Sequence, residues 1–178
     1  MKEKLLLALL FFIPSFCFAD GVFSKSEVIK VDSVSADELY GRAKVWIMNN
    51  FVSPGDVMAN EDQTNKIMTC KAAFSFSMGK MKYLAYEGVV EYVFTIQCRD
   101  GRAKVQITNV NHKNLPSHAP DCNLGTIMAE NNYTGMNKKY HSVVADEIKE
   151  LVSQEFITIV KGLTDAMNNP TNNSEDDW

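Results

Sequence analysis

Four side chains able to bind a metal ion lie close together in one polar segment of the chain. They are His112, His118, Asp121 and Cys122. Imidazole, carboxylate and thiolate groups are the ligands that zinc and similar metals take. Their spacing matches none of the compact metal-binding motifs, and no Cys-x-x-Cys pair accompanies them. The sequence therefore predicts no metal site, and the four residues are expected to be polar side chains of a loop.

Cys122 could instead serve as a nucleophile if His118 or His141 lay beside it as a base. No pattern marks a group that would orient the base, or a donor for an oxyanion. The chain also lacks a phosphate-binding glycine loop, a Gly-x-Ser-x-Gly elbow and a His-Glu-x-x-His motif. Adjacent carboxylates such as Glu61 and Asp62 suit a solvated turn. We predict no catalytic residue and no cofactor, which makes an enzyme the less favoured interpretation.

Two further cysteines, Cys70 and Cys98, are expected to be neighbours on the inner face of adjacent strands. A disulfide between them is compatible with an oxidising compartment. Direct cross-strand pairs strain the geometry of that bond, however, and free cysteine is among the most buried residue types. We therefore favour two buried thiols over a disulfide.

Positive charge gathers at one corner of the outer face of the predicted sheet. Arg99 and Arg102 flank a tight turn. The expected register adds Lys71, Gln97 and Lys104 as one row across three strands. An anionic ligand or an acidic partner could bind at such a corner. The simpler interpretation, which we favour, is a solvated sheet face whose long cations discourage edge pairing.

Periodicity and capping residues predict the elements that position these side chains. A capping box begins the first helix, because Ser35 can accept from the amide of Glu38 while the Glu38 carboxylate reaches back. Apolar residues at helical spacing then continue to Phe51. Strands are expected at 28–34, 57–61, 66–76, 89–99 and 102–110, and helices at 36–51 and 142–167. The polar segment 111–140 is expected to be a long loop.

Asp100 and Gly101 predict a two-residue hairpin in which both residues take positive φ. This turn would pair Cys98 with Ala103, Ile96 with Val105 and Phe94 with Ile107. All six side chains are small or apolar, so the turn and the pattern agree on one buried face. The preceding strand is expected to place Phe74, Ala72 and Cys70 opposite Phe94, Ile96 and Cys98. No turn residue defines that second register.

The order of elements is strand, helix, four strands and helix, with short connections that favour antiparallel pairing. We therefore predict a two-layer α+β domain in which both helices pack on one face of an antiparallel sheet. The domain is expected to span residues 20–170, a length that buries a large core without disulfides. The polar, acidic tail 171–178 is expected to be disordered.

Residues 1–19 have the features of a secretory signal peptide. Lysines precede an unbroken apolar run, and a small residue, Ala19, ends the segment. The run is shorter than the ~20 residues that span a bilayer, and no other stretch is long and apolar enough. We predict cleavage between Ala19 and Asp20, and export to the periplasm, the outer membrane or the medium. The alternative is a lipid anchor on Cys17, which the bulky Phe16 disfavours.

Composition and charge narrow the range of partners. The chain has 178 residues, with 18 Lys and Arg against 22 Asp and Glu, and a net charge of -4. Proteins that bind nucleic acid carry basic faces, so this balance gives no reason to expect a nucleic-acid partner. The hydrophobic share of 46% is ordinary for a globular protein and excludes wholesale disorder.

Three motifs carry a resemblance to a known family. They are the strand ending at Val34, the following Ser35-Ala36-Asp37-Glu38-Leu39-Tyr40 with Ala43 and Trp46, and the Asp100-Gly101-Arg102 hairpin. From about Val28 to Val110, and in the last helix, the chain resembles exported proteins of Bacteroidetes-type bacteria that form a domain-of-unknown-function family with a TATA-binding-protein-like fold. The resemblance implies this fold and export, but no reaction, cofactor or catalytic residue. A fold does not by itself imply DNA binding, because function lies in the site.

These observations favour a non-catalytic binding or protein-interaction module of the cell envelope. Its partner would be an envelope protein or a small ligand whose identity the sequence does not reveal. Candidate surfaces are the outer sheet face, the segment 78–86 and the segment 111–140. The alternative is a small-ligand-binding protein or an enzyme with its site between the sheet and the 111–140 loop.

Overall fold

The computed structural model describes residues 21–51 and 53–169. The predicted leader with its Ala19–Asp20 cleavage site, Cys17 and the tail 171–178 lie outside the described residues. In chain order the elements are β1 (Lys25–Lys30), α1 (Ala36–Asn50), α2 (Pro54–Val57), β2 (Met58–Asp62), β3 (Ile67–Phe76), η1 (Met81–Tyr86), β4 (Gly88–Arg99), β5 (Arg102–Asn114), η2 (Pro120–Cys122), β6 (Gly125–Thr126) and α3 (Lys138–Asn168). The symbol η denotes a 3-10 helix.

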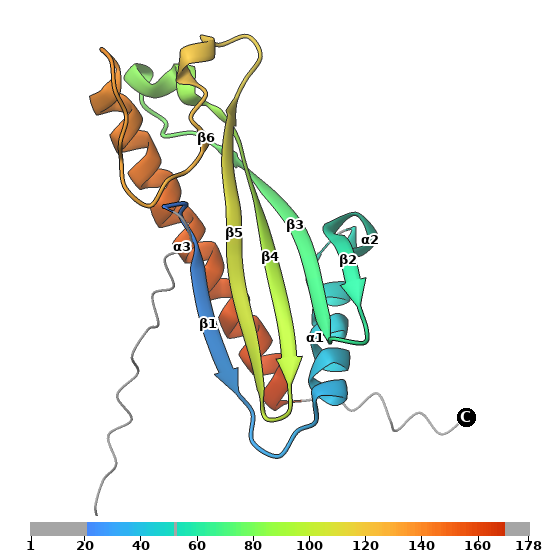
Figure 1. The fold of residues 1–178 in the computed structure, drawn as a ribbon. Coiled ribbons are helices and arrows are strands. Elements are labelled where there is room, and N and C mark those ends of the chain that lie inside the picture. The colour runs from blue at the N-terminus through green and yellow to red at the C-terminus, as the bar shows by residue number, and fades with distance from the viewer. Residues whose placement is uncertain (1–20, 52, 170–178) are drawn as a thin grey trace, which may run out of the picture.

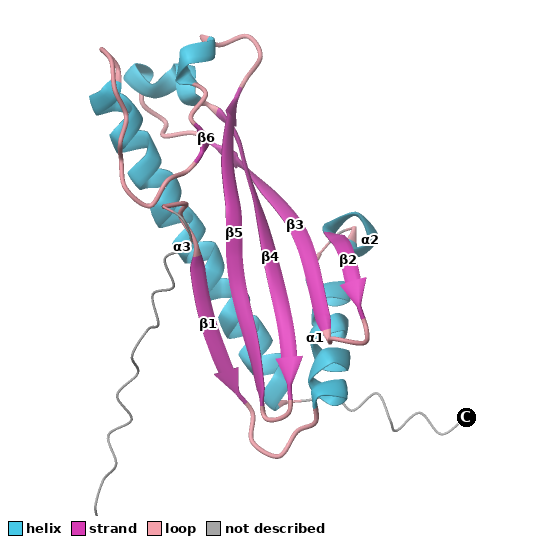
Figure 2. Cartoon of the chain, viewed as in Figure 1, coloured by secondary structure: helices cyan, strands magenta, loops and turns pink. Residues whose placement is uncertain are grey.

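The strands form one antiparallel sheet in the order β1-β5-β4-β3-β2, and the short β6 pairs with β5. The long helices α1 and α3 pack on the same face of this sheet, and the opposite face is left open along β1, β5 and β4 (Figures 1 and 2). The predicted two-layer α+β fold is therefore confirmed. In the described part of the chain, no helix combines the length and apolar character that a membrane span requires.

The hairpin between β4 and β5 forms in the predicted register. The pairs are Cys98 with Ala103, Ile96 with Val105 and Phe94 with Ile107. Gly101 has a φ of 72°, a conformation that costs glycine little. Asp100, expected to share the positive φ, does not. Its carboxylate turns instead to the start of α1, where it accepts a hydrogen bond from the Ala36 amide at 2.8 Å.

This contact also changes the expected capping box of α1. The Ser35 hydroxyl accepts a hydrogen bond from the Glu38 amide at 3.3 Å, as predicted. The Glu38 carboxylate does not reach back and instead forms an ion pair with Arg42 at 2.8 Å. Asp100 supplies a second cap from the hairpin turn, because an acidic oxygen can satisfy an amide at the helix start. The hairpin and α1 are thereby joined at one end of the sheet.

The register between β3 and β4 differs from the prediction. Phe94 faces Cys70 rather than Phe74, and Met68, not Ala72, faces Ile96. An alternating pattern fixes only which face a side chain takes, so a slip by an even number of residues leaves every side chain on its face. The connection from β3 to β4 contains η1 and has no tight turn that would set the pairing. The pattern of the strands alone could not distinguish the two registers.

The core lies between the covered face of the sheet and the two long helices. Fully buried side chains include Phe94, Ile96, Val105 and Ile107 of the sheet, Leu39, Ala43 and Ile47 of α1, and Ile148, Val152 and Leu163 of α3. The helices meet closely at Gly162 of α3, where a Cβ atom would lie 2.7 Å from the Trp46 indole nitrogen. A glycine is therefore needed where the Trp46 ring lies against α3.

The edge strand β2 is tied to α1 through Glu61. The Tyr40 hydroxyl and the Lys44 ammonium both donate to Oε1 of Glu61, each at 2.7 Å. The Lys44 hydrogen bond, followed by the one from Tyr40, lowers the pKa of Glu61. The expected solvated turn is wrong for this residue, because Glu61 lies within β2 opposite Met68, on the side of the sheet that faces α1.

Replacing Glu61 with glutamine is expected to destabilise the protein by about 1–2 kcal/mol at neutral pH, since the amide cannot hold the Lys44 charge. Because the pKa of Glu61 is lowered on folding, this stabilisation is present above its unfolded value and is lost as pH falls through the folded one. Urea denaturation at about pH 7 and about pH 3 measures the effect. The exposed Glu147→Gln is the matched control. A Glu61→Gln penalty of equal size at both pH values would contradict a role for the ionised carboxylate.

The segment 111–140 is more ordered than the predicted loop. β5 continues to Asn114, η2 follows at Pro120–Cys122, and β6 adds to the edge of β5. α3 begins at Lys138, four residues before the expected start at 142. The length of β5 explains part of the difference, because a register shift between Glu91 and Val93 of β4 lets the pairing continue beyond the predicted strand end.

Candidate anion-binding face

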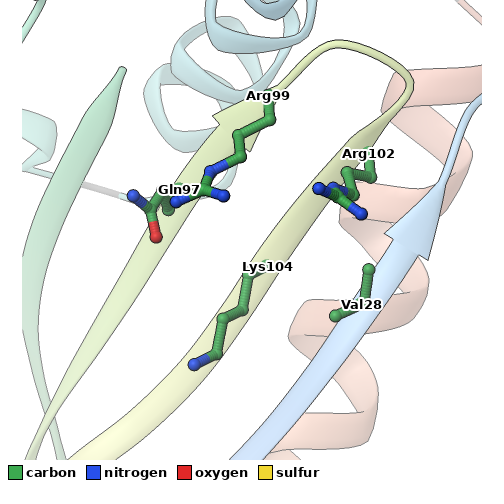
Figure 3. A pocket seen from close by; sticks show the side chains of 5 residues that line it. All are labelled: Val28, Gln97, Arg99, Arg102 and Lys104. Atoms are coloured by element: carbon green, nitrogen blue, oxygen red, sulfur yellow. The ribbon is translucent and has the colours of Figure 1, made fainter. Parts of the chain in front are cut away.

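A shallow hollow of about 300 Å³ lies on the open face of the sheet, next to the β4–β5 hairpin. Three strands supply its lining. The residues are Val28 of β1, Gln97 and Arg99 of β4, and Arg102 and Lys104 of β5. Their side chains project from the same side of the three strands (Figure 3). The face is the one that α1 and α3 leave uncovered, so the hollow is open to solvent.

Strand pairing places the cations of this face in two adjacent rows. In the first row, Arg102 lies between Arg99 on β4 and Lys30 on β1. In the second row, Lys104 lies between Gln97 and Val28. We refer to Lys30, Arg99, Arg102 and Lys104 as the cation cluster. It results from antiparallel pairing of three strands, because residues opposite one another on one face have Cβ atoms only about 5 Å apart.

The cation cluster is not neutralised by the rest of the described chain. All four side chains are exposed, and none forms an ion pair with a carboxylate of the described residues. The acid closest in sequence, Asp100, is directed to the Ala36 amide instead. Like charges directly opposite one another on a sheet are destabilising. The cluster therefore leaves unbalanced positive charge around a hollow, at some cost to folding.

The chemistry of the lining suits a compact anion. Two guanidinium groups can donate paired hydrogen bonds to carboxylate or phosphate oxygens, and Lys104 adds a point charge. Gln97 contributes an amide, while Val28, which is 47% exposed, supplies an apolar wall. The lining contains no nucleophile, carboxylate or imidazole. The arrangement can bind and orient an anion but offers no group for acid–base chemistry on it.

The sequence predicted part of this face. Arg99, Arg102, Gln97 and Lys104 lie where the hairpin register placed them. Lys71 does not belong to their row, because the β3 register puts it opposite Val93. Two contributors were missed, Lys30 and Val28 of β1. The pairing of β1 with β5 brings them to this face, and no local signal in the sequence shows that the first strand pairs with the last long one.

The four candidate ligand residues of the 111–122 segment do not form a metal site. His112 is fully buried, and its Nε2 lies 2.9 Å from the Tyr86 carbonyl oxygen. Its Nδ1 accepts a hydrogen bond from the Leu124 amide at 3.3 Å, and its ring packs edge-on against Phe76. Both nitrogens are therefore used by the fold. Among the described residues, no group of three or more His, Cys, Asp and Glu side chains is placed to hold a metal ion.

The other three candidate residues have different surroundings. The exposed Asp121 carboxylate accepts a hydrogen bond from the Asn137 amide at 3.0 Å. His118 has a buried Nδ1 without a hydrogen-bond partner among the described residues. Cys122 is buried, and burial is the main cause that raises the pKa of its thiol. A raised thiol pKa disfavours the thiolate that a nucleophile requires.

His141 does not serve Cys122 as a base. Its ring packs edge-on against Tyr86 and Tyr133, with centroid distances of 5.7 and 5.4 Å. No hydrogen bond joins the Cys122 thiol to His118 or His141 in the described chain. The segment thus contributes to an aromatic cluster at one end of the sheet.

Cys70 and Cys98 are free, buried thiols, as favoured from the sequence. They do not face each other, because Cys70 lies opposite Phe94 and Cys98 opposite Ala103. Burial raises the pKa of Cys70 to about 12 and that of Cys98 to about 11. Both thiols are therefore part of the apolar core and are poor nucleophiles.

Two solved structures from Bacteroidetes are similar to this chain in fold. A TBP-like protein from Parabacteroides distasonis superposes with a TM-score of 0.62 at 12% identity, covering 83% of this chain and 96% of that one. A DUF4468 family protein from Bacteroides ovatus gives a TM-score of 0.54 at 13% identity, covering 83% of this chain and 89% of that one. No curated protein matches the chain. At such identities these neighbours support the fold alone.

The family comparison agrees with these neighbours. Residues 26–113 match the family model described as a domain of unknown function (DUF4468) with TBP-like fold. The matched region runs from β1 to the end of β5 and so includes the whole cation cluster. The family and the fold that the sequence motifs indicated are confirmed, whereas the export that the resemblance implied stays a prediction. The chain therefore carries a domain of the DUF4468 family, a domain of unknown function with a TBP-like fold.

Proposed function

We propose that the protein is an exported, non-catalytic binding module that holds an anionic group on the open face of its sheet. The group would be a carboxylate or phosphate carried by an envelope protein or by a small ligand. The binding residues are Arg99, Arg102 and Lys104, with Gln97 and Val28 shaping the hollow.

One observation carries this proposal. Lys30, Arg102 and Arg99 lie side by side on three neighbouring strands without an ion-pair partner in the described chain. A sheet face needs no such row for solubility, because alternating charges serve that purpose without repulsion. A bound anion would remove the repulsion, which gives the row a physical reason.

Export rests on the predicted leader and on the family resemblance. The predicted cleavage leaves a chain that begins at Asp20, whereas acylation would leave one that begins at Cys17. The intact mass of the protein recovered from its own cells distinguishes the two. A mass that retains residues 1–19 would contradict export through this leader.

Binding is tested by calorimetric titration of the protein with two probes, inorganic phosphate and a tri-glutamate peptide. Phosphate tests the phosphate source, and the peptide tests the carboxylate source. The variant Arg99→Gln with Arg102→Gln is expected to weaken binding of the preferred probe at least about tenfold, since each lost contact is a charge-assisted hydrogen bond. Added salt is expected to weaken binding by the unaltered protein.

The matched control is Lys71→Gln with Lys161→Gln, which removes the same charge away from the hollow. It is expected to leave binding unchanged. The arginine variant is also expected to unfold at a higher temperature, because the repulsion between opposite cations is gone. Lost binding together with raised stability excludes misfolding as the cause. Failure of both probes to bind, or equal binding by the arginine variant, would overturn the proposal.

A further inference from the structure

The end of the molecule farthest from the hollow exposes several large apolar side chains. Met81 and Leu84 of η1 are 86% and 45% exposed. Met136, just before α3, is 99% exposed, and Tyr140 in the first turn of α3 is 42% exposed. The two segments lie side by side, because the rings of Tyr83 and Tyr140 pack edge-on at 5.9 Å (Figure 1).

Four lysines flank these apolar side chains. They are Lys80 and Lys82 around Met81, and Lys138 and Lys139 between Met136 and Tyr140. All four are exposed, and none forms an ion pair with a carboxylate of the described residues. Lys82 lies over the Tyr83 ring at 4.9 Å, a contact that leaves its charge in place. We call these four lysines with Met81, Leu84, Met136 and Tyr140 the lysine-rimmed tip.

The positions of two of these lysines are unfavourable for folding. Lys138 and Lys139 open α3, where the helix dipole already carries partial positive charge. No acidic residue lies in the first turn of α3, and the Asn137 side chain does not cap it. Asn137 donates instead to Asp121. The amides of the helix start, the dipole and the lysines therefore add to one positive potential beside exposed apolar groups.

We infer that the lysine-rimmed tip docks the protein on a membrane surface rich in anionic lipid. Apolar side chains on a protruding end can enter the headgroup region, while the lysines remain at the level of the lipid phosphates. Tyrosine suits this boundary, because its ring is apolar and its hydroxyl is polar. The inference goes beyond the proposed function, since it concerns a separate surface and a different partner.

Composition favours a lipid surface over a protein partner. Protein–protein interfaces are depleted in lysine at their centre, whereas lysine clusters next to apolar residues are typical of anionic-lipid binding. Carboxylates are also scarcer here than cations. Asp121 and Glu87 lie at this end, and each accepts a hydrogen bond, from Asn137 and Ser77 respectively.

The geometry relates the tip to the hollow. The β4–β5 hairpin and the cation cluster lie at one end of the sheet, and η1 with the start of α3 lies at the other (Figure 1). A protein attached by its tip would therefore present the hollow away from the bilayer. Tip binding and anion binding could occur in the same molecule.

Flotation with lipid vesicles tests the inference. Every protein compared carries Cys17→Ser, so that no acyl chain contributes. Vesicles of phosphatidylglycerol and phosphatidylcholine in equal parts are expected to bind the protein, and pure phosphatidylcholine vesicles are not. The charge reversal Lys82→Glu with Lys139→Glu is expected to lower the partition coefficient for these vesicles at least about tenfold. Its matched control, Lys71→Glu with Lys161→Glu, is expected to bind the vesicles as well as the protein without charge reversals.

A second variant tests the apolar part. Met81→Ser with Met136→Ser alters two side chains that are almost fully exposed, so the fold is expected to be unaffected. This methionine variant is expected to lose the part of the vesicle binding that persists in high salt, because salt screens the lysines but not the apolar contacts. Equal binding of both variants and the control, or no binding to anionic vesicles, would overturn the inference. Binding to a protein of the membrane but not to protein-free vesicles would also overturn it. Phosphate titration of the tip variants should be unchanged, which separates this test from that of the hollow.

Discussion

Replacing Gly88 with alanine is expected to destabilise the protein by about 3 kcal/mol or more, the upper range for a side chain forced into occupied space. Gly88 begins β4 and faces Asn114 at the end of β5. A Cβ atom at this position would lie 2.0 Å from the Lys113 carbonyl oxygen and 2.6 Å from the Asn114 Cα. Backbone atoms cannot yield as a flexible side chain can. The two strands would have to separate where they support η1 and the lysine-rimmed tip.

The chain offers a matched control for this substitution. Gly41 lies inside α1, and a Cβ atom there would meet nothing within 4 Å. Gly41→Ala is expected to stabilise the protein by about 0.5–1 kcal/mol, because alanine loses less conformational freedom in a helix. Urea denaturation of both variants measures the difference. The same chemical change is thus expected to act with opposite sign, and a Gly88→Ala protein as stable as the original would contradict the packing at the end of β4.

Replacing His112 with alanine is expected to cost about 3 kcal/mol at neutral pH, from lost packing and from two backbone groups, one of them buried, that lose a hydrogen-bond partner. The ring holds the Tyr86 carbonyl on one side and the Leu124 amide on the other. It therefore joins η1 to the segment that leads into β6. His112→Ala is also expected to weaken vesicle binding, because η1 and the preceding Lys80 together carry half of the lysine-rimmed tip.

The same residue gives a pH dependence with a defined sign. Burial lowers the pKa of His112. The unfolded chain then takes up a proton near pH 6.5 that the folded protein excludes, so stability falls as pH drops below about 6.5. Protonation would also put a hydrogen on Nδ1, which already accepts from the Leu124 amide.

His112→Gln separates packing from titration. Glutamine can still donate to the Tyr86 carbonyl but has no ionisable group. Its stability is expected to change less than that of the original protein between about pH 7.5 and about pH 5.5. A His112→Gln protein that loses as much stability as the original would contradict the buried neutral imidazole.

The two proposed surfaces have in common that each costs folding energy. The cation cluster opposes like charges across neighbouring strands, and the tip places lysines at the positive end of a helix dipole. Surface charges that oppose folding in two places, at opposite ends of one sheet, are the strongest physical indication that both ends bind anionic partners. Natural proteins tend to give up stability at functional sites.

A TBP-like fold does not by itself imply a nucleic-acid partner. The net charge of -4 opposes a broad electrostatic attraction to a phosphate backbone, and three of the four residues of the cation cluster line one hollow. Function follows the groups at a site, not the fold that carries them. The predicted absence of a nucleic-acid partner stays a prediction, and titration with a DNA duplex alongside the phosphate probe would measure it.

Local chemistry in the sequence determined the elements, the hairpin and the side-chain faces. Alternating residues and the Asp100-Gly101 turn fixed the β4–β5 register, because a two-residue turn leaves no freedom in the pairing. The capping serine and the helical stripe likewise placed the start of α1 at Ala36. Each of these signals lies within a few residues of the structure it determines.

Only the tertiary structure decided what depends on contacts between distant segments. The β3 register, the pairing of β1 with β5 that adds Lys30 to the cation cluster, and the burial of His112 all belong to this class. A period of two residues fixes a face but permits every even slip, and it carries no information about which strand lies alongside. His112 was expected to be a polar loop side chain, because a histidine in a polar stretch gives no sign of the carbonyl and amide that the fold brings to its two nitrogens.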